Sequence, residues 1–98
     1  MPSILTSVSA VEIMPRNTQR KSLVLLNEDS TDAIFIKMER SENTTVSATV
    51  HDYKIGPGGV IALNSVNDGT QAIQSRFTAV AAANTPRLAF FETEDIVR

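Results

Sequence analysis

The sequence predicts an all-β protein, a single antiparallel β-sandwich or jelly-roll-like barrel domain. Short apolar runs rich in β-branched and aromatic residues alternate with turn signals about every 8–12 residues, as in sandwiches and barrels. The strongest of these signals is Gly56-Pro57-Gly58-Gly59, because glycine reaches positive φ freely and proline fixes the entry to a turn. The third observation is that no helix-capping pattern precedes the segment most open to a helical interpretation, Gln71–Ala83.

The chain of 98 residues is expected to form one domain. Residues 1–15 are interpreted as an N-terminal strand or arm, and residues 16–98 as the sandwich core. Thr6–Ile13 has the β-branched content of an edge strand, and Pro15 ends it because proline cannot donate to a sheet ladder. This arm is the segment expected to pair with the sheet edge of a neighbouring molecule.

Two apolar runs, Leu23–Leu26 and Ala33–Ile36, flank the polar turn Asn27–Asp32, and this pattern predicts an antiparallel hairpin. Because Leu23–Leu26 is apolar on both sides, we expect a strand that is covered on both faces or lies at a subunit contact. Val46–Ile55 is predicted as a weak strand and Val60–Leu63 as a short one.

The segment Gln71–Ala83 is interpreted as a strand because Arg76–Val80 is aromatic and β-branched; a helical turn before Arg76 remains open. Across the reversal Asn84-Thr85-Pro86, Arg87–Thr93 is predicted to return as its hairpin partner. The predicted core consists of Leu23, Leu25, Ile34, Ile36, Val60, Phe77, Val80, Leu88 and Phe90.

Composition narrows the classes of function. The absence of cysteine excludes disulfides, thiolate zinc sites and cysteine nucleophiles. With a net charge of −2 and a pI of about 5.2, the chain has no bulk basic footprint for nucleic acid. No apolar run approaches the ~20 residues of a membrane span, and the first residues do not resemble a secretory signal, so we expect synthesis in a cytoplasm and no membrane partner.

No pattern points to catalysis, so the chain is expected not to be an enzyme and to have no catalytic, cofactor-binding or metal-binding residues. His51 beside Asp52 is more simply a solvated histidine than a catalytic pair. The remaining weak candidates lack the spacing of calcium or phosphate loops and are interpreted as an acidic tail or as turns. They are Glu92, Glu94 and Asp95, then Glu28, Asp29 and Asp32, and the turn Gly56–Gly59.

The most distinctive polar feature is the basic cluster Arg16, Arg20 and Lys21, directly ahead of the best strand. These cations could bind an acidic surface of a partner. The alternative is a solvated loop that balances the acidic turn of the same protein, and the sequence leaves both open. We take the three residues as the candidate partner-binding site.

The order of these motifs resembles the small all-β virion proteins of tailed bacteriophages, which decorate capsids or form head and tail accessory parts. The resemblance rests on R-K-S-L-V-L-L-N before an I-F-I strand, on P-G-G before an apolar strand, and on A-V-A-A-A-N-T-P-R-L-A-F-F-E. It covers Pro15–Ile36, Ile55–Leu63 and Ile73–Glu92, whereas Lys37-Met38-Glu39 stands where many relatives have glycines.

The resemblance implies a non-enzymatic structural protein located in the virion, after synthesis in the host bacterial cytoplasm. It implies a homo-oligomer, a trimer or a dimer, that binds the major capsid protein or a neighbouring virion protein. The alternative is a receptor-binding or carbohydrate-binding domain of a phage fibre or spike. The loops contain few aromatic residues, and sugar-binding surfaces need them.

Overall fold

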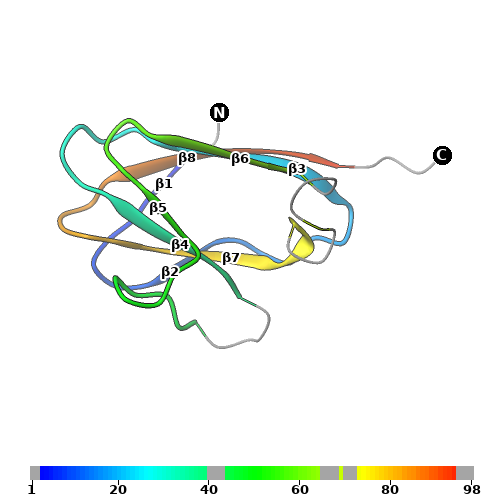
Figure 1. Ribbon diagram of the computed structural model, residues 1–98, viewed down its shortest axis with the longest axis horizontal. Coiled ribbons are helices and arrows are strands. Elements are labelled where there is room, and N and C mark those ends of the chain that lie inside the picture. Colours follow the sequence, from blue (N-terminus) through cyan, green and yellow to red (C-terminus); the bar gives the residue numbers. More distant parts are fainter. Residues whose placement is uncertain (1–2, 40–43, 65–68, 70–72, 95–98) are drawn as a thin grey trace.

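Two antiparallel four-stranded sheets pack face to face in the computed structural model, which describes residues 3–39, 44–64, 69 and 73–94 (Figure 1). Sheet A has the strand order β1-β8-β3-β6 and sheet B the order β2-β7-β4-β5. This confirms the predicted all-β sandwich. The strands are β1 (Ser3–Leu5), β2 (Val11–Met14), β3 (Arg20–Asn27), β4 (Ile34–Glu39), β5 (Tyr53–Ile55), β6 (Val60–Asn64), β7 (Arg76–Ala81) and β8 (Arg87–Glu94).

The chain changes sheet at every connection except β4–β5. The strand pairs are therefore nested in the sequence, with the first strand paired to the last: β1 pairs with β8, β2 with β7, β3 with β6 and β4 with β5. The pairs β3–β8 and β4–β7 then complete the two sheets.

Both predicted hairpins are wrong. β3 and β4 lie in different sheets, and so do β7 and β8, so neither pair shares a ladder. The physical reason is that each of these strands buries one apolar face, and consecutive strands bury those faces against each other across the core. A short polar connection can join two strands of opposite sheets, here called an arch, as readily as it joins two neighbouring strands in a hairpin.

A buried asparagine holds the connections together at one end of the sandwich. Asn27 is fully buried, and its Nδ2 lies 2.8 Å from the carbonyl oxygen of Asp32, 3.1 Å from that of Ile55 and 3.2 Å from that of Gly56. Its Oδ1 accepts a hydrogen bond from the Asp29 N–H at 3.0 Å. One side chain thus forms hydrogen bonds with backbone groups of both the β3–β4 and the β5–β6 connections and ties the two together.

The N-terminal segment is part of the sandwich, and of the predicted strand Thr6–Ile13 only Val11–Ile13 is a strand. β1 ends at Leu5 and β2 begins at Val11, because the chain crosses between the sheets here. Buried Thr6 donates both its N–H and its Oγ1–H to the Pro86 carbonyl oxygen, at 2.9 and 2.7 Å. Since β1 and β2 pair with β8 and β7 of the same chain, the segment is already used within the molecule.

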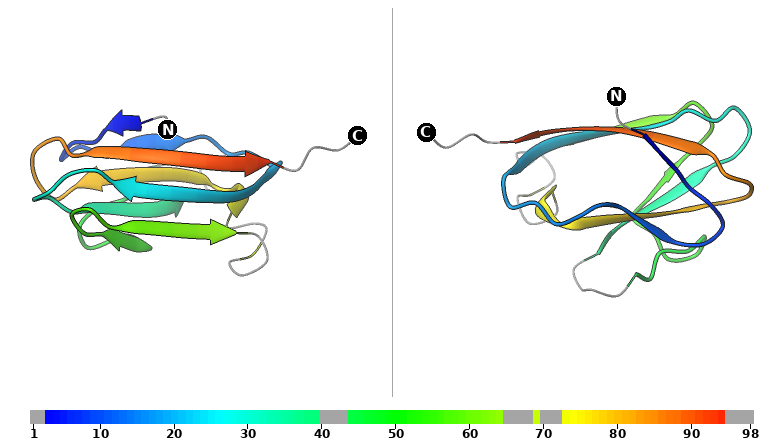
Figure 2. Two further views of the ribbon diagram at one scale, coloured as in Figure 1. Left: turned by 90° about the horizontal axis from the view of Figure 1, so that it is seen from above. Right: turned by 180° about the vertical axis from the view of Figure 1, so that it is seen from behind.

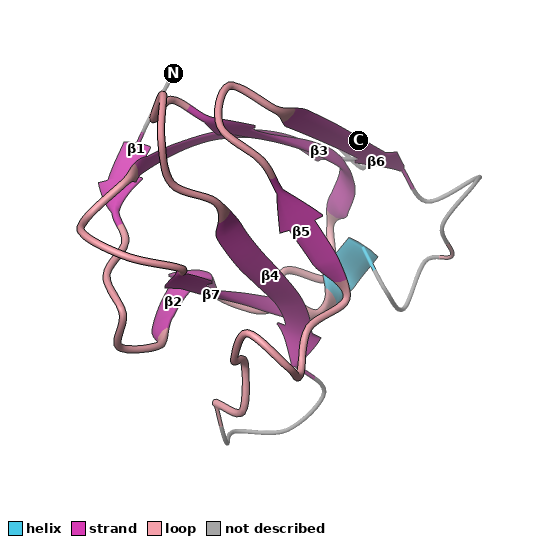
Figure 3. Ribbon diagram, turned by 60° about the vertical axis from the view of Figure 1, so that its left-hand side comes forward, coloured by secondary structure: helices cyan, strands magenta, loops and turns pink. Residues whose placement is uncertain are grey.

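Two other segments differ from or refine the prediction. Only Tyr53–Ile55 of the predicted strand Val46–Ile55 is a strand, because the preceding residues fold over sheet B instead. A helical turn at residues 73–74 precedes β7, and it resolves the question left open for this segment (Figure 3).

Most of the predicted core is confirmed. Seven of the nine residues are buried: Leu23, Leu25, Ile34, Ile36, Phe77, Val80 and Leu88. Phe90 is only partly buried against the core. Val60 is wrong, because 60% of it is exposed, and Ile61 and Leu63 pack toward the core in its place. The error is one of phase, since a shift of one residue along a strand exchanges its two faces.

Candidate interaction surface

The outer face of sheet A is apolar and exposed. The register places Val24 of β3 beside Ala62 of β6 and Phe91 of β8, and Leu26 beside Val60. Val60 is 60% exposed and Phe91 is 50% exposed. Figure 2 shows β8, β3 and β6 side by side from above, with no described segment lying over them.

The apolar surface extends to β1 at one edge of the sheet. Leu5 is 55% exposed and pairs with Arg87, whose Nη1 donates to Ser3 Oγ at 2.9 Å. Arg87 is a charged side chain at this edge of the face. The outer-face patch is hereafter the group Leu5, Val24, Leu26, Val60, Ala62 and Phe91. Contiguous apolar surface of this kind marks interaction sites on small proteins.

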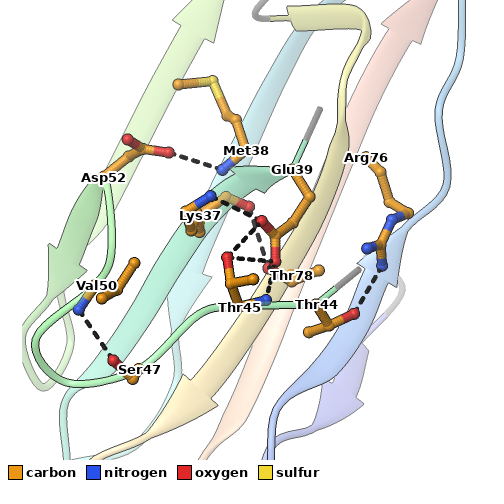
Figure 4. Close-up of polar contacts among 10 residues, drawn as sticks. All are labelled: Lys37, Met38, Glu39, Thr44, Thr45, Ser47, Val50, Asp52, Arg76 and Thr78. Atoms are coloured by element: carbon orange, nitrogen blue, oxygen red, sulfur yellow. Dashed lines mark hydrogen bonds and ion pairs between the residues drawn. The ribbon is translucent and has the colours of Figure 1, made fainter. Parts of the chain in front are cut away.

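The outer face of sheet B is, by contrast, covered by the chain itself. Residues 44–52, the strap, fold back across β4 and β7 (Figure 4). Val46 of the strap is buried against Phe35 and Val80 in a second, small apolar cluster. The His51 ring lies 4.7 Å from the Phe35 ring, centroid to centroid. The two outer faces therefore differ: the strap covers that of sheet B, and none of the described segments covers that of sheet A.

A buried carboxylate attaches the strap to sheet B. Glu39 is 2% exposed, and its oxygens accept hydrogen bonds from the Thr45 N–H, from Thr45 Oγ1 at 3.0 Å, from Lys37 Nζ at 2.7 Å and from Thr78 Oγ1 at 3.4 Å (Figure 4). Burial alone would raise the pKa of Glu39, but the bonds from Lys37 and Thr45 outweigh it, so the pKa is lowered from its ordinary value. The ionised form thus holds the strap.

The structure separates the three residues of the basic cluster. Arg20 is 2% exposed, so its expected role in binding a partner is wrong. Its Nε lies 2.6 Å from Glu92 Oε2, and its Nη1 donates to the carbonyl oxygens of Ile73 and Ser75, both at 2.9 Å. Its Nη2 donates to the Pro15 carbonyl oxygen at 2.8 Å.

Arg20 also stacks on the core, with its guanidinium carbon 5.5 Å from the centroid of the Phe77 ring. It is the first residue of β3 and Asn27 is the last, so the two buried polar side chains sit at opposite ends of one strand. Arg20 therefore closes the end of the sandwich away from Asn27. Its guanidinium donates hydrogen bonds to backbone carbonyl oxygens just after the end of β2 and just before the start of β7.

The other two basic residues are exposed. Arg16 lies in the loop between β2 and β3, and Lys21 lies at the start of β3, where the ladder with β8 has a bulge. Both are at the Arg20 end of the sandwich. They remain candidates for contact with an acidic partner surface.

Several of the weaker polar candidates have structural partners. His51 Nδ1 lies 3.2 Å from the Ser47 carbonyl oxygen, whereas Asp52 Oδ2 accepts the Met38 N–H at 2.8 Å. The pKa of Asp29 is lowered because its carboxylate accepts the N–H groups of Asp32 and Thr31. Glu92 pairs with Arg20, Glu94 ends β8, and Asp95 lies outside the described residues.

Within residues 3–39, 44–64, 69 and 73–94, no three histidine, cysteine or acidic side chains gather as metal ligands would. No helix in the same residues is long and apolar enough to cross a membrane.

Sequence reasoning missed most of the outer-face patch. The two-sided apolar run Leu23–Leu26 did signal it, since Leu23 and Leu25 are buried while Val24 and Leu26 are only half-buried on the other face. The pattern predicts Val60 to lie in the core, which is wrong, and Phe91 is not among the core residues it singles out. Leu5 carried no signal, because its exposure depends on where β1 joins the sheet.

Comparison with protein-family models, with curated proteins and with solved structures gives no match to this chain.

Proposed function

We propose that the chain is a jelly-roll domain and a non-enzymatic structural protein of a phage virion. Its role is that of a capsid decoration, cement or head accessory protein, which self-associates and binds the particle surface. The observation that carries this proposal is the difference between the two outer faces: the strap covers sheet B, whereas the apolar patch on sheet A has exposed side chains and no cover from the part of the chain that the structure describes.

The jelly-roll interpretation is supported by the nested strand pairs. Pairing of β1 with β8, β2 with β7, β3 with β6 and β4 with β5 is the pattern of one long antiparallel ribbon wrapped into two sheets. Jelly rolls of eight strands recur in viral capsid domains, in lectins and in cupins. Fold alone does not decide among these, so the site must.

The patch favours a protein partner. Aromatic side chains are enriched at the centres of protein interfaces, and Phe91 lies directly beside Val24 on the outer face of sheet A. A major capsid protein with a complementary apolar surface would bury Phe91, Val60 and Leu26 together. Arg16 and Lys21, exposed at one end of the sandwich, would accelerate association with an acidic rim.

The same features make a carbohydrate-binding or receptor-binding role the weaker alternative. Sugar sites usually present several aromatic rings to solvent. The only tyrosine, Tyr53, is half-buried and packs against the core. Among the described residues, Phe91 is the only aromatic side chain with a large solvent-exposed fraction, 50%.

The test is occupancy on purified particles of the phage or prophage that encodes the chain. Phe91→Ser removes the largest exposed apolar side chain of the patch, and we expect it to weaken particle binding about tenfold or more, as loss of an interface anchor does. Val50→Ser is the matched control, because Val50 is 45% exposed on the strap, over the other sheet. Equal occupancy of both variants and the wild type would overturn the proposal.

A further inference from the structure

Four strands stand at the edges of the two sheets, and only β6 is open to pairing. β1 and β5 have three residues each, and β5 carries Lys54. β2 contains a bulge and Glu12. Short edges, charges and bulges are the devices by which proteins prevent edge-to-edge association. β6, in contrast, reads VIALN over five residues with no charge, no proline and no bulge in its ladder with β3.

The register shows which backbone groups β6 presents outward. The Asn27 N–H donates to the Gly59 carbonyl oxygen at 3.0 Å, one step beyond the pair Leu26–Val60. Because hydrogen-bonded and non-hydrogen-bonded pairs alternate along an antiparallel ladder, Ile61 and Leu63 exchange the bonds with β3. Val60 and Ala62 therefore point their N–H and C=O groups away from the sheet.

We infer that the β6 edge is the self-association site, and that a second copy of the chain pairs with it antiparallel about a two-fold axis. This rests on the self-association in the proposed function and names its surface. In such a pair Val60 of one copy lies opposite Ala62 of the other, and about four backbone hydrogen bonds form. No like charges meet, because neither residue nor Ile61 between them is charged.

A second copy of the chain is favoured over a strand of another protein because the β6 edge is continuous with the outer-face patch. Val60 and Ala62 carry their side chains on the outer face of sheet A, within the patch. Joining two β6 edges fuses the two patches into one apolar surface of twice the width, across an eight-stranded sheet. A contact of one short strand buries little area, so the dimer is weak and concentration-dependent.

The experiment is sedimentation equilibrium of the purified protein from about 10 μM to about 1 mM, the range expected for a small interface. The wild type is expected to shift from monomer to dimer. Ala62→Pro removes an outward N–H without removing a bond to β3, so it is expected to stay folded by circular dichroism and to remain monomeric.

Ala62→Lys gives a second test that does not depend on proline, because the two lysines would be diagonal neighbours on the same face, close to the two-fold axis, and would repel each other. Ala48→Lys, in the exposed strap over sheet B, is the matched control and should dimerise normally. Dimerisation of both folded Ala62 variants would overturn the β6 assignment while leaving self-association standing. A monomeric wild type at the highest concentration would overturn both, whereas particle occupancy tests the virion role separately.

Discussion

Replacing Arg20 with methionine tests whether this buried cation holds the sandwich closed. Methionine preserves most of the aliphatic stem and removes the guanidinium. The change leaves the carbonyl oxygens of Ile73, Ser75 and Pro15 without their donor, and Glu92 without its partner. Breaking a buried ion pair by removing one partner typically costs about 3–5 kcal/mol.

We take about 3–5 kcal/mol as the whole expected loss, because the four contacts belong to one group and do not add. A chain of this length has a free energy of unfolding of about 5–15 kcal/mol. The variant should thus lose a large part of its stability, and its Tm should fall by at least about 12 °C. Urea unfolding followed by circular dichroism measures the difference directly.

Two variants serve as controls. Arg16→Met changes an exposed cation four positions earlier and should alter stability by no more than about 0.5 kcal/mol. Glu92→Gln removes only the partly exposed ion-pair partner, at 32% side-chain exposure, and should cost about 1 kcal/mol. If Arg20→Met loses less than about 1 kcal/mol, the guanidinium does not close the sandwich as described.

Three further predictions concern the core, the strap and the arch connections. Phe77→Ala should cost about 3–5 kcal/mol because the ring is fully buried, whereas Val60→Ala on the outer face should change stability by no more than about 0.5 kcal/mol in urea unfolding. Because the folded pKa of Glu39 lies below its ordinary value of 4.5, its stabilising effect is present above that value and is lost as the pH falls through the folded pKa. The protection factors of the strap amides, which compare each measured exchange rate with the intrinsic rate at the same pH, should therefore fall in acid, and Glu39→Gln should remove this acid dependence. Asn27→Ala should cost about 2–4 kcal/mol, since it leaves buried groups of two connections without partners; a calorimetric Tm equal to that of the wild type would refute this.

The sequence predicted where most strands lie but not how they pair. Leu23–Leu26, Val60–Leu63, Arg76–Val80 and Arg87–Thr93 all fall within observed strands, since β-branched runs and turn residues are local signals. Pairing depends on which strand lies across the core. The loop Asn27–Asp32 has the composition of a hairpin turn, yet its first residue uses its side chain to bind a different connection.

The candidate site shows the same limit. Arg20 looked like its neighbours Arg16 and Lys21, because nothing adjacent in the sequence marks it as buried. Its partners Glu92, Ile73 and Ser75 are more than fifty positions away and meet it only in the folded chain. The strap was likewise invisible, because Val46 and Glu39 act through contacts with strands that the local pattern cannot identify.

Hydroxyl-radical footprinting of the protein, free and bound to particles, shows which face of the sandwich contacts the particle. The chain carries five exposed large apolar side chains among its described residues, and they report on different surfaces. If the outer face of sheet A is the contact, oxidation of Leu5, Val60 and Phe91 should fall on binding, while Val8 and Val50 keep their free rates. Protection of Val50 with unchanged oxidation of Phe91 would contradict the account and assign the contact to the strap side.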